Sequence, residues 1–128
     1  MIKTDKQLSS LRQIRAAIEH FHKVDYECAI TLAAAGEGQI KEKTGNHLFR
    51  LIRKRFSAEE TNLVVNWLKH ASGPYNAEIA EQEAVVTITR AIQKFVGSFE
   101  ATHPDFEKFS EWAMQKGYTN KPMTEKAK

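Results

Sequence analysis

The chain has 128 residues, of which 41% are hydrophobic and 27% charged, a profile typical of one compact domain that folds without a disulfide or a structural metal. A lone cysteine, Cys28, excludes a disulfide framework and a Cys-rich zinc site. The formal net charge of +3 is unevenly spread: residues 1–56 carry 11 Lys and Arg against 6 Asp and Glu, and residues 57–118 carry 5 against 9. Such asymmetry suits a bound polyanion or two copies meeting face to face, although a solvated surface is the simpler interpretation.

The first half of the chain predicts three helices. Apolar residues spaced three and four apart predict an amphipathic helix over 5–22. Asp25 can cap a second helix, which should end or weaken at Gly36 and Gly38 unless another backbone comes close there. A short basic helix follows Gly45 and Asn46.

The second half predicts three more helices. Ser57 and Glu60 have the spacing of a capping box, and the helix they open should stop at the Ser72, Gly73, Pro74 cluster. Its buried side should comprise Leu63, Val64, Trp67 and Leu68. A regular seam over 85–99, within a helix of about 77–99, is typical of a bundle or a coiled-coil pair, so we expect a homodimer that uses it.

Pro104 suits the first turn of the last helix, which Gly117 should end. Its aromatic residues, Phe106, Phe109 and Trp112, are expected in the core rather than as base-stacking residues. No segment has the alternation of a strand. We therefore predict an all-α, single-domain, up-and-down bundle of five or six helices over residues 1–118, followed by a flexible basic tail over 119–128.

Composition and motifs predict where the protein is located and argue against several classes of function. With no membrane span or secretory signal visible and a single thiol, we expect a cytoplasmic protein. Phosphate-loop, dinucleotide, zinc-protease and nucleophile-elbow motifs are missing, so we expect no cofactor. The five histidines have no ligand spacing supported by a carboxylate, and we expect no metal. Cys28, without an evident activating neighbour, should be a buried small hydrophobe.

The end of the fourth helix carries the most informative polar cluster. Asn66 and His70 lie four residues apart and share a helix face, with Lys69 beside them. A neutral His70 could accept the proton of a ribose 2′-hydroxyl while cations stabilise the phosphate, which is metal-free RNA cleavage chemistry. The alternative is that His70 only caps the helix.

A second cluster lies on the short basic helix. His47, Arg50, Arg53 and Lys54 are candidate phosphate-binding residues, and their contacts would be insensitive to sequence and weakened by salt. A solvated basic helix remains the alternative.

The Asn66-x-x-x-His70 spacing, followed by a long helix with Ala84, Ala91, Ile92 and Phe95, resembles the HEPN superfamily of small helical bundles. That family usually has R-N-x-x-x-H, and its active members cut RNA with the Arg and the His, often across a dimer. Here Val65 occupies the Arg position. The resemblance therefore implies an RNA-binding bundle with a degenerate site, because an apolar side chain cannot replace a guanidinium on phosphate.

The chain also resembles a set of uncharacterised bacterial helical proteins that share A-I-x-x-F, I-H-T-L-A-A-A and N-F-F-K-H-A-D stretches. The matching segments here are 17–21, 30–35 and 66–71. This likeness implies a fold and no function. Two further pairs, Arg15 with His20 and Arg15 with His22, have spacings that occur in HEPN-like sequences, although a solvent-facing side of the first helix is the simpler interpretation.

These observations leave two hypotheses. In the first, the protein handles RNA or a nucleotide phosphate through His70, Asn66 and Lys69, with phosphate contacts from Arg50 or Arg53. In the second, it is a non-catalytic scaffold whose helices dock another protein or a small ligand between them. Whether the protein is an enzyme is left open by the sequence.

Overall fold

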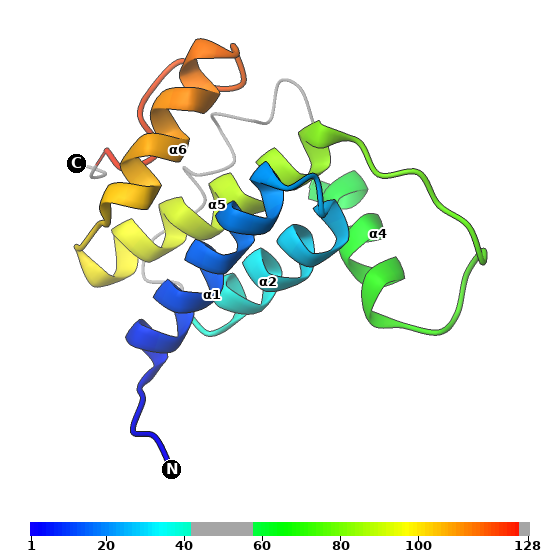
Figure 1. Ribbon diagram of the computed structural model, residues 1–128, viewed down its shortest axis with the longest axis horizontal. Coiled ribbons are helices and arrows are strands. Elements are labelled where there is room, and N and C mark those ends of the chain that lie inside the picture. Colours follow the sequence, from blue (N-terminus) through cyan, green and yellow to red (C-terminus); the bar gives the residue numbers. More distant parts are fainter. Residues whose placement is uncertain (42–57, 126–128) are drawn as a thin grey trace.

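The computed structural model describes residues 1–41 and 58–125, and within them helices are the only regular secondary structure (Figure 1). The five helices are α1 (Lys6–His22), α2 (Tyr26–Gly38), α4 (Ala58–Lys69), α5 (Glu81–Phe99) and α6 (Pro104–Gln115). This confirms the all-α class. The basic helix expected before Phe56 and the capping box at Ser57 lie outside the described residues.

The centre of the molecule is α5, which packs against α1, α2, α4 and α6. Its seam residues Val85, Ile88, Ile92 and Phe95 are at most 1% exposed. The regular spacing that suggested a dimer interface is thus satisfied inside one chain for these four residues, and the expected homodimer stays a prediction. The helix also begins at Glu81 rather than near 77, because the Glu83 carboxylate accepts the backbone N–H of Ala80 at the first turn.

The tightest helix pair is α1 with α2, joined by a turn that places Val24 at a positive φ of 63°. Gly36 sits against α1, where an added Cβ would lie 2.9 Å from Ile14 Cγ1 and 3.3 Å from the Ser10 carbonyl oxygen. The Ser10 hydroxyl donates a 2.8 Å hydrogen bond to the Gly36 carbonyl. The sequence predicted that α2 ends near Gly36 and Gly38 or that another backbone comes close there. Both occur, since α2 ends at Gly38 and Gly36 packs closely against α1.

Two helix ends follow the sequence-based expectations closely. Pro104 is the first residue of α6, and the Nδ1 of His103 accepts the backbone N–H of Asp105 to cap it. Gly117, at a φ of 80°, follows the end of α6. At α2 the cap differs, because Asp25 makes no side-chain hydrogen bond to the helix and instead lies 3.4 Å from the His20 ring.

The segment after α6 differs from the flexible tail expected over 119–128. Thr119 is buried and Met123 is 1% exposed. The backbone N–H of Met123 donates to the Ser110 hydroxyl at 2.8 Å, and the Thr124 hydroxyl donates to Glu107. Burying a methionine contributes about 2 kcal/mol, and it acts together with these two hydrogen bonds to hold residues 119–125 against α6.

The α4 region is packed much less closely than the rest. In Figure 1, α4 and the loop after it lie on the side of the molecule opposite α6. Leu63 is 65% exposed, and Val64, Trp67 and Leu68 are only half-buried, so the predicted buried side of this helix is buried in part. The loop is held back mainly at Trp67, whose indole N–H donates to the Pro74 carbonyl at 2.7 Å.

Candidate functional site

A groove of about 490 Å³ lies between α1 and α6, within the size range of small-molecule sites. Arg15 of α1 contacts Asp105 of α6, and seven residues further along each helix His22 lies beside Trp112. The two helices therefore run in the same direction. The groove is lined by Arg12, Arg15, Ala16, Ile18, Glu19, His22, Asp105, Lys108, Phe109 and Trp112.

One end of the groove is cationic. Arg12 and Arg15 are one turn apart on α1, and Lys108 is one turn beyond Asp105 on α6. Among the described residues, neither Arg12 nor Lys108 is in an ion pair. The two carboxylates of the lining already have partners, since Glu19 lies 3.4 Å from Lys23 and Asp105 binds Arg15. The lining therefore has a surplus of positive charge.

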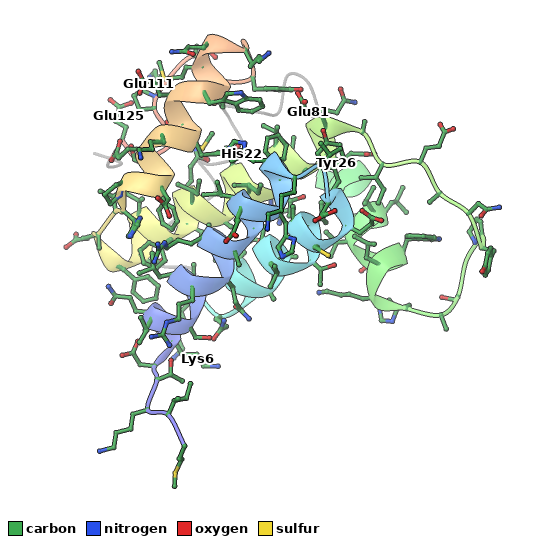
Figure 2. The ribbon with its side chains drawn as sticks, in the orientation of Figure 1. Lys6, His22, Tyr26, Glu81, Glu111 and Glu125 are labelled. Atoms are coloured by element: carbon green, nitrogen blue, oxygen red, sulfur yellow. The ribbon has the colours of Figure 1, made fainter. Side chains whose placement is uncertain are left out.

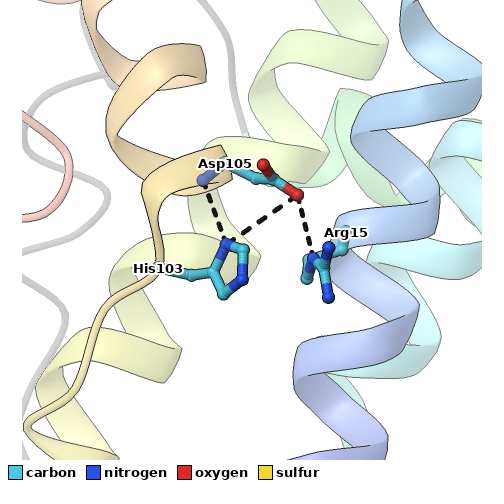
Figure 3. A network of polar contacts seen from close by, with 3 residues as sticks. All are labelled: Arg15, His103 and Asp105. Carbon is cyan, nitrogen blue, oxygen red and sulfur yellow. Dashed lines mark hydrogen bonds and ion pairs between the residues drawn. The ribbon is translucent and has the colours of Figure 1, made fainter.

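Figure 3 shows the polar network that joins the two helices at this end. The Nε of Arg15 donates to Oδ2 of Asp105 at 2.9 Å, and Nδ1 of His103 lies 3.8 Å from the same oxygen. The hydrogen bond from Arg15 holds the pKa of Asp105 below its ordinary value, and the positive charges of Arg15 and Lys108 act in the same direction. Asp105 is consequently a carboxylate at neutral pH and orients a guanidinium.

The other end of the groove is aromatic. Trp112 is half-buried and has ring neighbours on several sides: Phe21 at 5.1 Å, Phe109 at 5.6 Å, Tyr118 at 5.9 Å and His22 at 6.5 Å between centroids. Such edge and stacked contacts fix the indole in place. Phe106 and Phe109 are fully buried, as the core prediction requires, whereas Trp112 contributes to the groove wall.

A carboxylate supported by two tyrosines lies near this aromatic end. The Tyr118 hydroxyl donates to Oε1 of Glu81 at 2.6 Å. Burial, followed by the charge of Glu81 and hydrogen bonding to it, raises the pKa of Tyr26. Figure 2 shows Tyr26, Glu81 and His22 near one another in the upper middle of the view. These contacts join the start of α5 to α2 and to the segment after α6, so they fix the frame on which the groove is built.

The residues expected to carry chemistry lie elsewhere. Asn66, Lys69 and His70 are all exposed at the end of α4, away from the groove. The backbone N–H of His70 donates to the Asn66 carbonyl at 3.1 Å, which continues the helix by one residue. The phosphate-binding candidates His47, Arg50, Arg53 and Lys54 lie outside the described residues. Cys28, expected to be buried, is exposed on α2.

Sequence reasoning singled out Arg15 and His22 through their spacing but did not connect them with α6. Asp105 and Lys108 carried no motif. Their role depends on the packing of α6 beside α1, which joins residues 90 positions apart. The part of the groove lining that the sequence does indicate is one face of α1, where polar residues recur at helical spacing: Arg12, Arg15, Glu19 and His22.

Comparisons of the chain with protein-family models, with curated proteins and with solved structures each found no match. Within residues 1–41 and 58–125, no helix is long and apolar enough to cross a membrane. In that same part of the chain, no three His, Cys, Asp or Glu side chains are grouped as metal ligands.

Proposed function

We propose that the protein binds a nucleotide-sized phosphate ligand in the groove between α1 and α6. The observation that carries this proposal is the convergence of Arg12, Arg15 and Lys108, from two helices, on one end of a groove whose other end is formed by Trp112. Guanidinium and ammonium groups bind phosphate, and an indole offers a surface to a base. A cationic end beside an aromatic end suits a ligand that carries both groups.

This proposal keeps the phosphate-handling function expected from the sequence and places it on different residues. It also agrees with the small-ligand form of the scaffold hypothesis, because no reaction is required. The groove is open, so the bound ligand would remain in contact with water and its affinity would fall as salt rises.

Calorimetric titration with AMP, adenosine and inorganic phosphate tests the proposal. AMP should bind more tightly than phosphate or adenosine, because it alone uses both ends of the groove. Lys108→Ala should weaken AMP binding several-fold, whereas Lys116→Ala removes the same charge just after α6, outside the groove lining, and should leave it unchanged. No saturable binding at millimolar AMP, or equal effects of the two substitutions, would contradict it.

A second candidate function follows from the exposure of the α4 end. We propose as the alternative that His70, with Asn66 and Lys69, forms a degenerate HEPN-like site that cleaves RNA without metal, completed across a homodimer. Its support is that all three side chains are open to solvent at one helix end. Incubating labelled structured RNA in EDTA with the wild type and with His70→Ala tests it. Cleavage lost in the variant supports the enzyme, and intact RNA in both excludes it.

A further inference from the structure

We infer that Asp105 is a positioning residue for the groove: its carboxylate holds Arg15 through Nε, so that the two terminal nitrogens of the guanidinium are left for the phosphate. This inference rests on the proposed function and deepens it, because it assigns the phosphate contact to one defined edge of one side chain. It also assigns Asp105 a role that its negative charge alone would not suggest in an anion site.

The geometry of Arg15 supports this assignment. Among the described residues, its hydrogen bonding runs through Nε, which donates to Asp105 Oδ2 at 2.9 Å, and its side chain is 46% exposed. Guanidinium groups bind phosphate with two parallel N–H donors, and both Nη groups of Arg15 remain for that purpose. Arg15 lines the groove and its side chain is not covered, so we assign this edge to the ligand.

Asp105 is itself held from two directions (Figure 3). Its backbone N–H donates to Nδ1 of His103 at 3.0 Å, and its carboxylate is bonded to Arg15. Because the carboxylate sits in the first turn of α6, the arginine is fixed relative to the same helix that supplies Lys108 and Trp112. A free arginine loses rotamer entropy when it binds a ligand, and one that is already held loses less.

A competing role for Asp105 predicts the opposite change in ligand affinity when its charge is removed. If the carboxylate merely repels the ligand, neutralising it should tighten binding. If it positions Arg15, neutralising it should weaken binding despite the gain in positive charge. We expect Asp105→Asn to weaken AMP binding about twofold to fivefold, because Arg15 is no longer held in place and the removed repulsion offsets only part of that loss. Asp105→Glu, which keeps the carboxylate, should retain more of the affinity.

Arginine side-chain NMR without ligand separates this inference from the proposed function. The Nε–H signal of Arg15, assigned by its loss in Arg15→Lys, should exchange slowly with water in the wild type and faster in Asp105→Asn. Glu111→Gln makes the same charge change on α6 outside the groove lining and should alter neither this signal nor AMP affinity. In the Arg15→Lys background, Asp105→Asn should cause no further loss of affinity.

Two results would overturn the positioning role: an Arg15 Nε–H signal that is the same in the wild type and in Asp105→Asn, or AMP binding that is unchanged or tighter in Asp105→Asn. If the wild type does not bind AMP although the NMR contrast is present, the proposed function fails, and the ligand role of Asp105 fails with it. Circular dichroism and thermal melting of each variant ensure that a folded protein is compared.

Discussion

The α1–α2–α5–α6 bundle and the α4 region are both amphipathic in sequence, yet they are packed very differently. In the bundle, apolar residues such as Ile14, Ile92 and Phe95 are at most 1% exposed, whereas in the α4 region Leu63 is 65% and Tyr75 is 95% exposed. The difference teaches that helical periodicity predicts which face is apolar but not whether the rest of the chain covers it. Substitutions in matched pairs can test this contrast.

The largest difference should come from removing a large apolar side chain in each region. Phe95 is 1% exposed and packs against Phe99 and Phe106, with ring centroids 4.9 and 5.4 Å apart. Phe95→Ala should lower the free energy of unfolding by about 3–5 kcal/mol, and Leu63→Ala by less than about 0.5 kcal/mol. Urea denaturation followed by circular dichroism measures both values. Similar losses would mean that the α4 region is as firmly packed as the bundle.

Replacing either of two glycines of the bundle by alanine should change the stability of the protein, but in opposite directions. At Gly36 a methyl group would press on Ile14 and on the Ser10 backbone, so Gly36→Ala should destabilise the protein by about 1–3 kcal/mol. Gly97 lies inside α5 with nothing within 4 Å of an added Cβ, so Gly97→Ala should stabilise it by about 0.5–1 kcal/mol. Melting temperatures that change in the same direction in both variants, relative to the wild type, would contradict this.

A smaller, local effect is expected at the loop after α4. Gly73 has a φ of 101° and lies against the Trp67 ring, so Gly73→Ala should strain the loop by about 1–2 kcal/mol. The indole N–H of Trp67, which donates to Pro74, should then exchange faster with water. The indole of Trp112 in the bundle is the internal control and should not change. NMR resolves both signals in one sample.

The smallest effect is the pH dependence of the Arg15–Asp105 pair. The pKa of Asp105 is lowered in the folded protein, so the pair stabilises the fold above the pH at which an unfolded aspartate titrates, near 4, and this contribution is lost as the pH falls through the lower folded value. Both side chains are more than a third exposed, so the contribution should be below about 1 kcal/mol. The stability difference between wild type and Asp105→Asn should shrink between about pH 6 and pH 2. A difference that is constant with pH would contradict it.

Part of the candidate site could be predicted and part could not. Arg15 and His22 share a face of α1 because their spacing is helical, and this was visible in the sequence. Asp105 looked like an ordinary acidic residue in the first turn of a helix. Only the packing of α6 beside α1 places its carboxylate on Arg15, because two residues 90 positions apart carry no local signal of which helices meet.

The sequence by itself determined the helices, since backbone hydrogen bonds, caps and turn residues act over three or four positions: α1, α6 and the stop at Gly117 all follow from such local rules. Tertiary structure decided what each helix faces. It placed the 85–99 seam inside one chain, brought Met123 back into the core and paired Arg15 with Asp105. Burial and ion pairing depend on distance in space, and residues far apart in the chain gain that proximity only when the helices pack.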